Sequence, residues 1–166
     1  MTVPATAEET QQVLTEHASE PAIQALAAQL PDAVLGARYD RQELTLTVAR
    51  ESIVAVCRAV QQAGYNFLAD VTCVDWYPSN PRFRVTYHLL SHSLHRRLRL
   101  CVMVSEGDPS VDSITGVWPA ANFYEREVFD LFGVRFGGHP NLRRIMMPED
   151  YNGHPLRKDF PVEGYR

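Results

Sequence analysis

The sequence has no apolar run of about 18 residues, the length that a membrane-spanning helix needs. It contains neither of the glycine-rich nucleotide motifs, GxGxxG and the P-loop, and it lacks the GxSxG motif of serine hydrolases. The first twenty residues are polar and acidic, without the basic start and apolar centre of a signal peptide. These absences argue against membrane spanning, nucleotide binding and serine-hydrolase chemistry, and we expect a cytoplasmic protein.

Cysteine and lysine are also scarce. The three cysteines, Cys57, Cys73 and Cys101, are widely separated in apolar segments, and no CxxC pair occurs. Because an iron–sulfur cluster needs about four thiolates, this chain is not expected to hold one alone. We expect buried, reduced thiols and no bound cofactor. Lys158 is the single lysine among 16 basic residues, and the arginines suit bidentate ion pairs.

The net charge of −4 is unevenly distributed. Residues 1–132 hold 10 basic and 16 acidic side chains, a net charge of −6. Residues 133–166 hold 6 basic and 4 acidic side chains, a net charge of +2. A nucleic-acid-binding domain has a clear basic excess, which this chain lacks, so we expect no nucleic-acid partner.

The hydrophobic periodicity predicts an α+β fold. Apolar spacing and terminal Pro and Gly residues predict helices over 21–30, over 50–64 and in the segment that ends at Gly133. Because the strands come in runs, rather than in strict alternation with helices, we expect a two-layer sandwich: a mixed five-stranded sheet with helices on one face. The expected strands cover 33–40, 43–49, 66–78, 82–91 and 96–105, with tight turns near Asp40 and Ser93.

The chain divides into three predicted parts: a flexible lead-in (1–20), a compact α+β domain (21–133) and an extended, partner-binding tail (134–166). Proline and glycine exclude a long helix from the tail, yet the tail is too apolar to be disordered. We therefore expect it to lie extended against its own domain or against a partner. Its large apolar residues are Ile145, Met146, Met147, Tyr151, Leu156, Phe160 and Tyr165.

The segment FYEREVFDLFG (123–133) places charged residues in an apolar helix. Buried charge is costly unless it is paired or does chemistry. Acidic side chains at Glu125, Glu127 and Asp130, together with a histidine, are candidate metal ligands or acid–base groups. The favoured interpretation is an ion-pair node, in which these acids and Arg126 meet arginines such as Arg143 or Arg144.

The histidines give no clear metal motif. His88 and His92 on one strand face would lie about 13 Å apart, too far to share an ion, and His95 lies beyond the hairpin turn. His139 and His154 each precede a proline, and we interpret them as loop residues.

Two linked blocks resemble a known family. The run E-R-E-x-x-D-L-F-G (125–133), followed by L-R-R-I-x-x-P-x-D-Y-x-G-H-P-L-R-K-D-F-P (142–161), resembles the C subunit, or 30 kDa subunit, of the proton-pumping NADH:quinone oxidoreductases, respiratory complex I. DWYPSNPRFRVTYHLLS (75–91) is similar to the middle region of the same family, and the resemblance extends over residues 21–161.

The resemblance implies a two-layer α+β scaffold subunit of the hydrophilic arm, without a catalytic centre of its own. It implies that partner subunits hold the FMN, iron–sulfur clusters and quinone, through which electrons pass from NADH with coupled proton translocation. The implied partners are chiefly the D subunit, and also the B and I subunits, on the cytoplasmic side of the cell membrane. The residues expected at the interface or in the ion-pair node are Glu125, Arg126, Glu127, Asp130, Arg143, Arg144, Asp150, Arg157, Lys158 and Asp159.

Three other interpretations stay open at this point. The chain is the equivalent subunit of a membrane-bound hydrogenase, or of a deazaflavin- or ferredoxin-linked relative of complex I. Alternatively, it is a stand-alone metal enzyme that uses the carboxylates of residues 125–130, or a stand-alone module whose tail docks on an unrelated protein.

Overall fold

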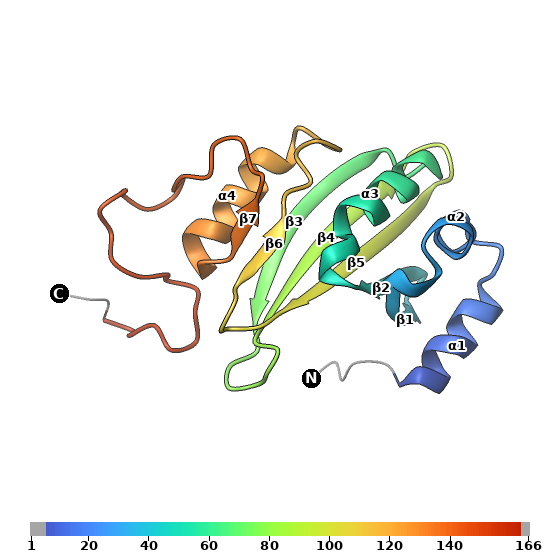
Figure 1. The fold of residues 1–166 in the computed structure, drawn as a ribbon, viewed down its shortest axis with the longest axis horizontal. Coiled ribbons are helices and arrows are strands. Elements are labelled where there is room, and N and C mark those ends of the chain that lie inside the picture. Colours follow the sequence, from blue (N-terminus) through green and yellow to red (C-terminus); the bar gives the residue numbers. More distant parts are fainter. Residues whose placement is uncertain (1–5, 164–166) are drawn as a thin grey trace.

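The computed structural model describes residues 6–163 of the chain. Within this range the order of elements agrees with the expected helix, two strands, helix, three strands and helix, with one helix added before them, one short strand after them and one short strand before the last helix (Figure 1). The helices are α1 (Ala7–Glu16), α2 (Pro21–Gln29), α3 (Ile53–Gln62) and α4 (Ala121–Phe132), with 3-10 turns at Pro31–Ala33 and Arg50–Ser52. The strands are β1 (Val34–Asp40), β2 (Glu43–Val48), β3 (Phe67–Asp75), β4 (Phe83–Ser91), β5 (Arg96–Val104), β6 (Ser110–Asp112) and β7 (Arg135–Gly137).

The central sheet has five strands in the order β1-β2-β5-β4-β3. β2 and β5 pair in parallel, whereas the other neighbours are antiparallel, so the sheet is mixed. Helix α3 crosses one face of this sheet, and α4 packs against β3 (Figure 1). The predicted α+β class, the mixed five-stranded sheet and the extended tail are thereby confirmed.

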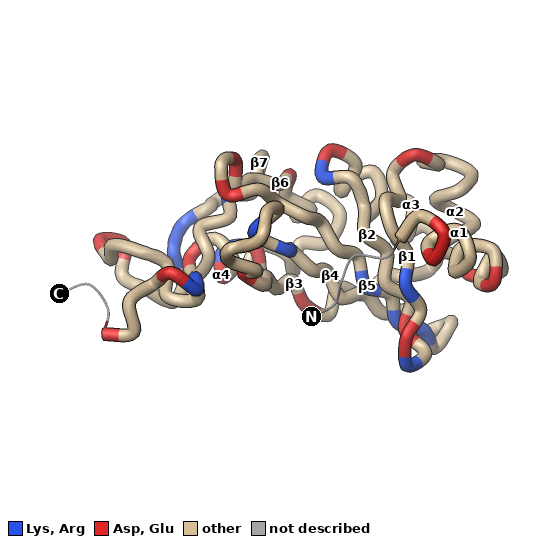
Figure 2. The backbone as a smooth tube through the Cα atoms, turned by 90° about the horizontal axis from the view of Figure 1, so that it is seen from below, with Lys and Arg blue, Asp and Glu red and all other residues tan. Residues whose placement is uncertain are grey.

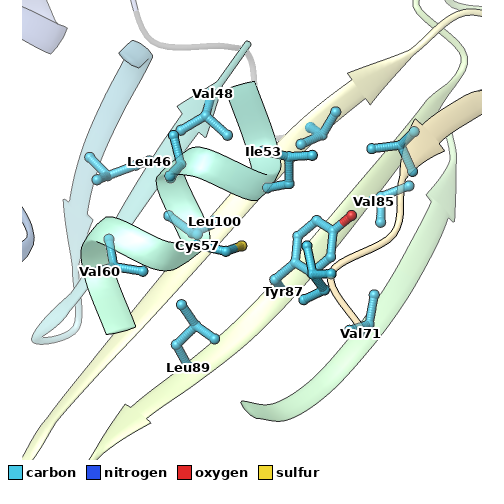
Figure 3. Close-up of a cluster of buried hydrophobic side chains, with 14 of the residues drawn as sticks. Leu46, Val48, Ile53, Cys57, Val60, Val71, Val85, Tyr87, Leu89 and Leu100 are labelled. Carbon is cyan, nitrogen blue, oxygen red and sulfur yellow. The ribbon is translucent and has the colours of Figure 1, made fainter. Parts of the chain in front are cut away.

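The core lies between α3 and the sheet. Figure 3 shows Ile53, Cys57 and Val60 of α3 clustered with Leu46, Tyr87 and Leu100, which belong to β2, β4 and β5. All of these side chains are buried, as the apolar stripe of the helix and the alternation of the strands predicted. Each buried Leu, Ile or Val side chain contributes about 1.5–3 kcal/mol to folding, so this layer holds the scaffold together.

Helix α1 corrects the predicted flexible lead-in. Thr6 and Glu9 form a capping box, in which each side chain accepts the backbone N–H of the other residue. The hydroxyl of Thr10 accepts the N–H of Ala37, so the helix covers the outer edge of β1. The prediction for 1–20 is wrong for residues 7–16, because Thr-x-x-Glu is a helix start signal that outweighs the polar composition. Residues 1–5 lie outside the described range.

The compact part continues past the predicted boundary at residue 133. β7 pairs in parallel with β6, and Val134 and Phe136 are buried. From residue 138 to residue 163 the chain has no helix or strand and runs around α4 (Figure 1). Residues 164–166 lie outside the described range. In the part of the chain that the structure describes, no helix is long and apolar enough to cross a membrane.

Candidate functional site

Asp130, near the end of α4, is the centre of the contact between the body and the tail. Its side chain is fully buried. Oδ2 accepts three consecutive backbone N–H groups, from Ile145 (2.9 Å), Met146 (2.7 Å) and Met147 (2.8 Å). Oδ1 accepts the guanidinium of Arg144 at 2.7 Å. Burial acts to raise the pKa of Asp130, but these hydrogen bonds outweigh it and lower the pKa, so the carboxylate stays charged.

Two arginines fix the backbone of the tail around this carboxylate. Arg126 of α4 donates to the carbonyls of Arg143 (3.1 Å) and Arg144 (3.0 Å). Arg144 also donates to the carbonyls of Tyr151 (2.8 Å) and Gly153 (3.1 Å). The guanidinium of Arg144 therefore joins α4 to two separate stretches of the tail.

The tail also satisfies the carbonyl groups that α4 leaves without partners at its end. His154 Nδ1 donates to the carbonyl of Asp130 (2.9 Å), and Arg157 Nε donates to that of Phe132 (2.6 Å). The helix ends at Gly133, whose φ of 76° is left-handed, and a Cβ there would lie 2.6 Å from Arg157 Nη2. Glycine is needed for both the conformation and the close approach. His154 lies in a loop, as predicted, and its side chain contacts the end of the helix.

A second charged cluster lies at the loop between β3 and β4. Arg82 is only 1% exposed. Its guanidinium makes a bidentate contact with Asp75, at 2.9 and 2.7 Å, and a second one with Asp159 of the tail, at 2.6 and 3.0 Å. Glu106 is a third carboxylate partner at 2.5 Å. The backbone N–H of Lys158 donates to Asp75 (2.8 Å), so Asp75 and Arg82 together hold two consecutive tail residues.

The hydrogen bonds of this cluster lower the pKa of Asp75. Burial acts to raise it, but the hydrogen bonds from Arg82, Lys158 N–H and Tyr77 N–H prevail and lower the pKa to about 2. The carboxylate is therefore charged throughout the physiological pH range.

Sequence reasoning missed Arg82 and Asp75. One signal was available: an acid that ends one strand and an arginine that precedes the next are neighbours in a hairpin, where opposite charges pair. No such local signal joins this pair to Asp159, because residues 82 and 159 are 77 positions apart in the chain.

Glu125 is not part of an arginine-paired node, and this prediction is wrong. Residues five apart on a helix point about 140° away from each other, so Glu125 and Asp130 meet different surroundings. Glu125 is buried and accepts from the hydroxyl of Ser113 (2.6 Å) and the N–H of Ile114 (2.7 Å). Burial raises its pKa to about 7, and these two hydrogen bonds only partly offset the increase.

His139 lies beside Glu125 without forming a strong pair. The two side chains are fully buried, and His139 Nε2 is 3.9 Å from a carboxylate oxygen. The N–H of Asn141 donates to Nδ1 (3.0 Å), so Nε2 carries the ring proton and donates to the carbonyl of Asn122 (3.2 Å). Burial lowers the pKa of His139, so the imidazole is neutral and does not stabilise a charged Glu125.

The remaining residues of the predicted set do not join one cluster. The side chain of Glu127 is exposed and makes no hydrogen bond or ion pair within residues 6–163. Arg143 and Asp150 are exposed, and only the backbone carbonyl of Arg143 is used. Glu125, Glu127 and Asp130 do not converge, and no three acid, histidine or cysteine side chains of the described range form a metal-binding group. The geometry therefore does not support these carboxylates as joint metal ligands.

Replacing Glu125 with glutamine is expected to remove a pH dependence of stability. Because the pKa of Glu125 is raised from 4.5 to about 7, its favourable contribution is present below pH 4.5 and is lost as the pH rises through about 7. Glutamine stays neutral and still reaches Ser113 and Ile114. We expect the Tm of Glu125→Gln to match the wild type near pH 4.5 and to exceed it by about 2–8 °C at pH 8. Thermal unfolding at several pH values measures this, with exposed Glu127→Gln as the control; parallel curves for the wild type and Glu125→Gln would contradict it.

Comparison with known proteins identifies close similarities. A sequence model of the family described as respiratory-chain NADH dehydrogenase, 30 Kd subunit, matches residues 46–166. The C subunit of NADH-quinone oxidoreductase from Roseiflexus sp. (strain RS-1) is 49% identical over 143 residues, covering 84% of this chain and 82% of the relative. The protein of the same name from Geobacter sulfurreducens is 49% identical over 133 residues, covering 79% and 82%.

Solved structures agree with this similarity. A structure titled "Nqo5 of the trypsin-resistant fragment (1-134) in P63 form" has 33% identity and a TM-score of 0.63, covering 77% of this chain and 98% of that chain. A chain in a structure of the membrane-bound sulfane sulfur reductase, an archaeal respiratory membrane complex, has 24% identity and a TM-score of 0.75, covering 88% and 86%. The second likeness concerns the fold alone.

Proposed function

Because the chain belongs to the family of the 30 kDa subunit of respiratory-chain NADH dehydrogenase, we propose that it serves as the C subunit of an NADH–quinone oxidoreductase. In this role it is a scaffold in the hydrophilic arm of the complex, on the cytoplasmic side of the membrane. Electrons pass from NADH through FMN and iron–sulfur clusters to quinone in other subunits, coupled to proton translocation, and this chain has no catalytic centre of its own.

The observation that carries this proposal is the two-sided character of the tail. Three of its charged side chains, those of Arg144, Arg157 and Asp159, turn inward to Asp130, the end of α4 and Arg82. Several large apolar side chains turn outward, and Met146 is 64% exposed. An apolar surface on a backbone that is already held in place suits a protein interface, because binding then orders few additional groups. The exposed apolar residues of the tail are Ile145, Met146, Leu156 and Val162.

We assign the D subunit as the chief partner of this surface, with the B and I subunits as further neighbours. We also propose that this chain binds no FMN and no iron–sulfur cluster. The chemistry of its thiols supports this: all three cysteines are buried, and burial raises the pKa of each, that of Cys73 to about 12. Cluster ligation needs thiolates, which this setting disfavours.

The test is assembly in native membranes with a matched pair of variants. Met146→Asp places a charge on the proposed interface, whereas Leu35→Asp does so on β1, far from the tail, at a residue of nearly equal exposure (63%). We expect tagged wild-type chain and Leu35→Asp to co-purify with the other subunits and with NADH:quinone reductase activity. Met146→Asp should lose about tenfold or more of this co-purification, because a charge is desolvated at the interface. Equal recovery of the two variants would refute the role of the tail, and wild-type chain that recovers no other subunit would refute the proposed function.

A further inference from the structure

A charged hollow lies at the end of the sheet remote from the tail. Because β2 and β5 run in parallel and Leu44 is in register with Leu98, their preceding hairpin turns, 41–42 and 92–95, lie side by side. Between them is a cavity of about 500 Å³, open to solvent. In Figure 2, basic positions gather beside the β1 and β5 labels, away from the C-terminal tail. The lining residues are Glu20, Tyr39, Arg41, Gln42, Glu43, Leu44, Leu94, His95, Arg96 and Arg97.

The acids of this hollow are already paired. The buried carboxylate of Glu20 contacts Arg96 and accepts the hydroxyl of Tyr65 (3.3 Å). Glu43 contacts Arg99 on the neighbouring strand. Both acids are therefore neutralised by arginines of β5, and they leave no free negative charge toward the cavity.

The remaining basic groups have no such partner. Arg41 and Arg97 are exposed, and neither makes an ion pair with a group in residues 6–163; the same holds for His95. The hollow thus presents two unpaired guanidinium groups and an imidazole, on a chain whose net charge is −4. A local excess of the opposite sign on an acidic chain attracts a negatively charged partner.

The turn backbone adds an independent observation. Arg41 and Gln42 have φ values of 49° and 63°, and His95 has a φ of 51°. Gly, Asn, Asp and His are the residues most often found in such left-handed turn positions, so the unusual residues here are Arg41 and Gln42. Long polar side chains that are kept at a conformational cost indicate that the side chains themselves are used.

We propose that this hollow binds an acidic segment of another polypeptide of the assembly, whose Asp or Glu carboxylates contact Arg41 and Arg97. The inference rests on the proposed function for the identity of that polypeptide as a fellow subunit. Small-molecule pockets are mostly apolar and enclose their ligand, whereas this hollow is polar and open. Nucleic acid would need a basic excess over the whole domain. A protein segment with alternating acids fits two exposed arginines that lie side by side, Arg41 in the first turn and Arg97 at the start of β5.

The experiment is site-specific photo-crosslinking in the assembled complex, so that the tail keeps the protein in place and only the local contact is measured. Ser93, in the second turn, is replaced by the photo-reactive p-benzoylphenylalanine, and the crosslinked peptide is identified by mass spectrometry. We expect a crosslink to an Asp- and Glu-rich segment of a neighbouring subunit. Its yield should fall as salt is raised from about 0.05 to about 0.5 M, since the Debye length shortens.

Reversing the charge of Arg41 and Arg97 tests whether these two arginines hold the crosslinked segment. In the background of Arg41→Glu with Arg97→Glu, the yield should fall about tenfold or more, because like charges then face each other. Arg58→Glu with Arg135→Glu makes the same charge change at exposed arginines elsewhere and should leave the yield unchanged. Three results would overturn this inference in a chain that still co-purifies with its complex. They are a crosslink to a segment without acidic excess, a crosslink to lipid, and equal crosslink yields in the two double variants. Absence of any co-purifying subunit with the wild-type chain overturns both this inference and the proposed function.

Discussion

Asp130→Asn is expected to release residues 143–147 of the tail from α4. The substitution keeps the size of the side chain but removes the charge that three backbone N–H groups and Arg144 share. It also places the N–H₂ group of the new amide opposite N–H groups of the tail, and two donors cannot hydrogen-bond to each other. Loss of one partner from a buried charged contact costs about 3–5 kcal/mol, which corresponds to a roughly 100-fold or greater increase in the open population of this segment.

Limited trypsin digestion measures this population, because Arg143 and Arg144 are cleavage sites that the docked tail protects. Cleavage at these two residues should accelerate by about the same factor in Asp130→Asn. Glu127→Gln, three residues earlier on the same helix and exposed, is the control and should digest like the wild type. Digestion of Asp130→Asn at the wild-type rate would show that the carboxylate does not hold the tail.

Arg82→Met is expected to destabilise the whole fold. The guanidinium is the common partner of Asp75, Glu106 and Asp159, and Asp75 is buried at the end of β3. Methionine fills much of the space but leaves Asp75 as a buried charge without its counterion, at a cost of about 3–5 kcal/mol. For a chain of this size the Tm should fall by about 6–20 °C. Arg82→Lys should recover little of this loss, because an ammonium group cannot make the two bidentate contacts.

Arg84→Met is the matched control for this variant. Arg84 lies two residues later, stacks on Trp76 and makes no hydrogen bond through its buried Nε. We expect a change in unfolding free energy of less than about 1 kcal/mol, measured by urea denaturation for all three variants. Equal losses for Arg82→Met and Arg84→Met would show that the carboxylate cluster contributes nothing beyond packing.

The acid stability of the chain should change with Arg82. In the wild type, the lowered pKa of Asp75 contributes stability that is fully present above its ordinary value of 3.8 and is lost as the pH falls through about 2. Without Arg82 the strongest cause of the lowered pKa is gone. Arg82→Met should therefore lose this contribution. The difference in unfolding free energy between the wild type and Arg82→Met should become smaller as the pH falls toward 2.

The sequence predicted the sheet and the helices because burial on one face imposes a period of 2 or 3.6 on neighbouring residues, as in Leu44, Leu46 and Val48. It also singled out FYEREVFDLFG as the place where charge is buried. It named Arg143 and Arg144 as arginine partners for these acids, but it could not predict which of the acids an arginine would meet. Asp130 binds residues 144–147, whereas Glu125 turns to Ser113, and this division depends on where the chain runs after Gly133.

The pairing of β2 with β5 has a consequence for synthesis on the ribosome. The β1–β2 hairpin emerges first, with its outer edge covered by α1, but its inner edge has no neighbour until β5 has been translated. Since β3, β4 and β5 form a continuous meander, we expect these three strands to fold as soon as they leave the exit tunnel. The β1–β2 hairpin then pairs with β5 as the last step in forming the sheet. Until then the nascent hairpin exposes an edge that a chaperone or another nascent chain can occupy.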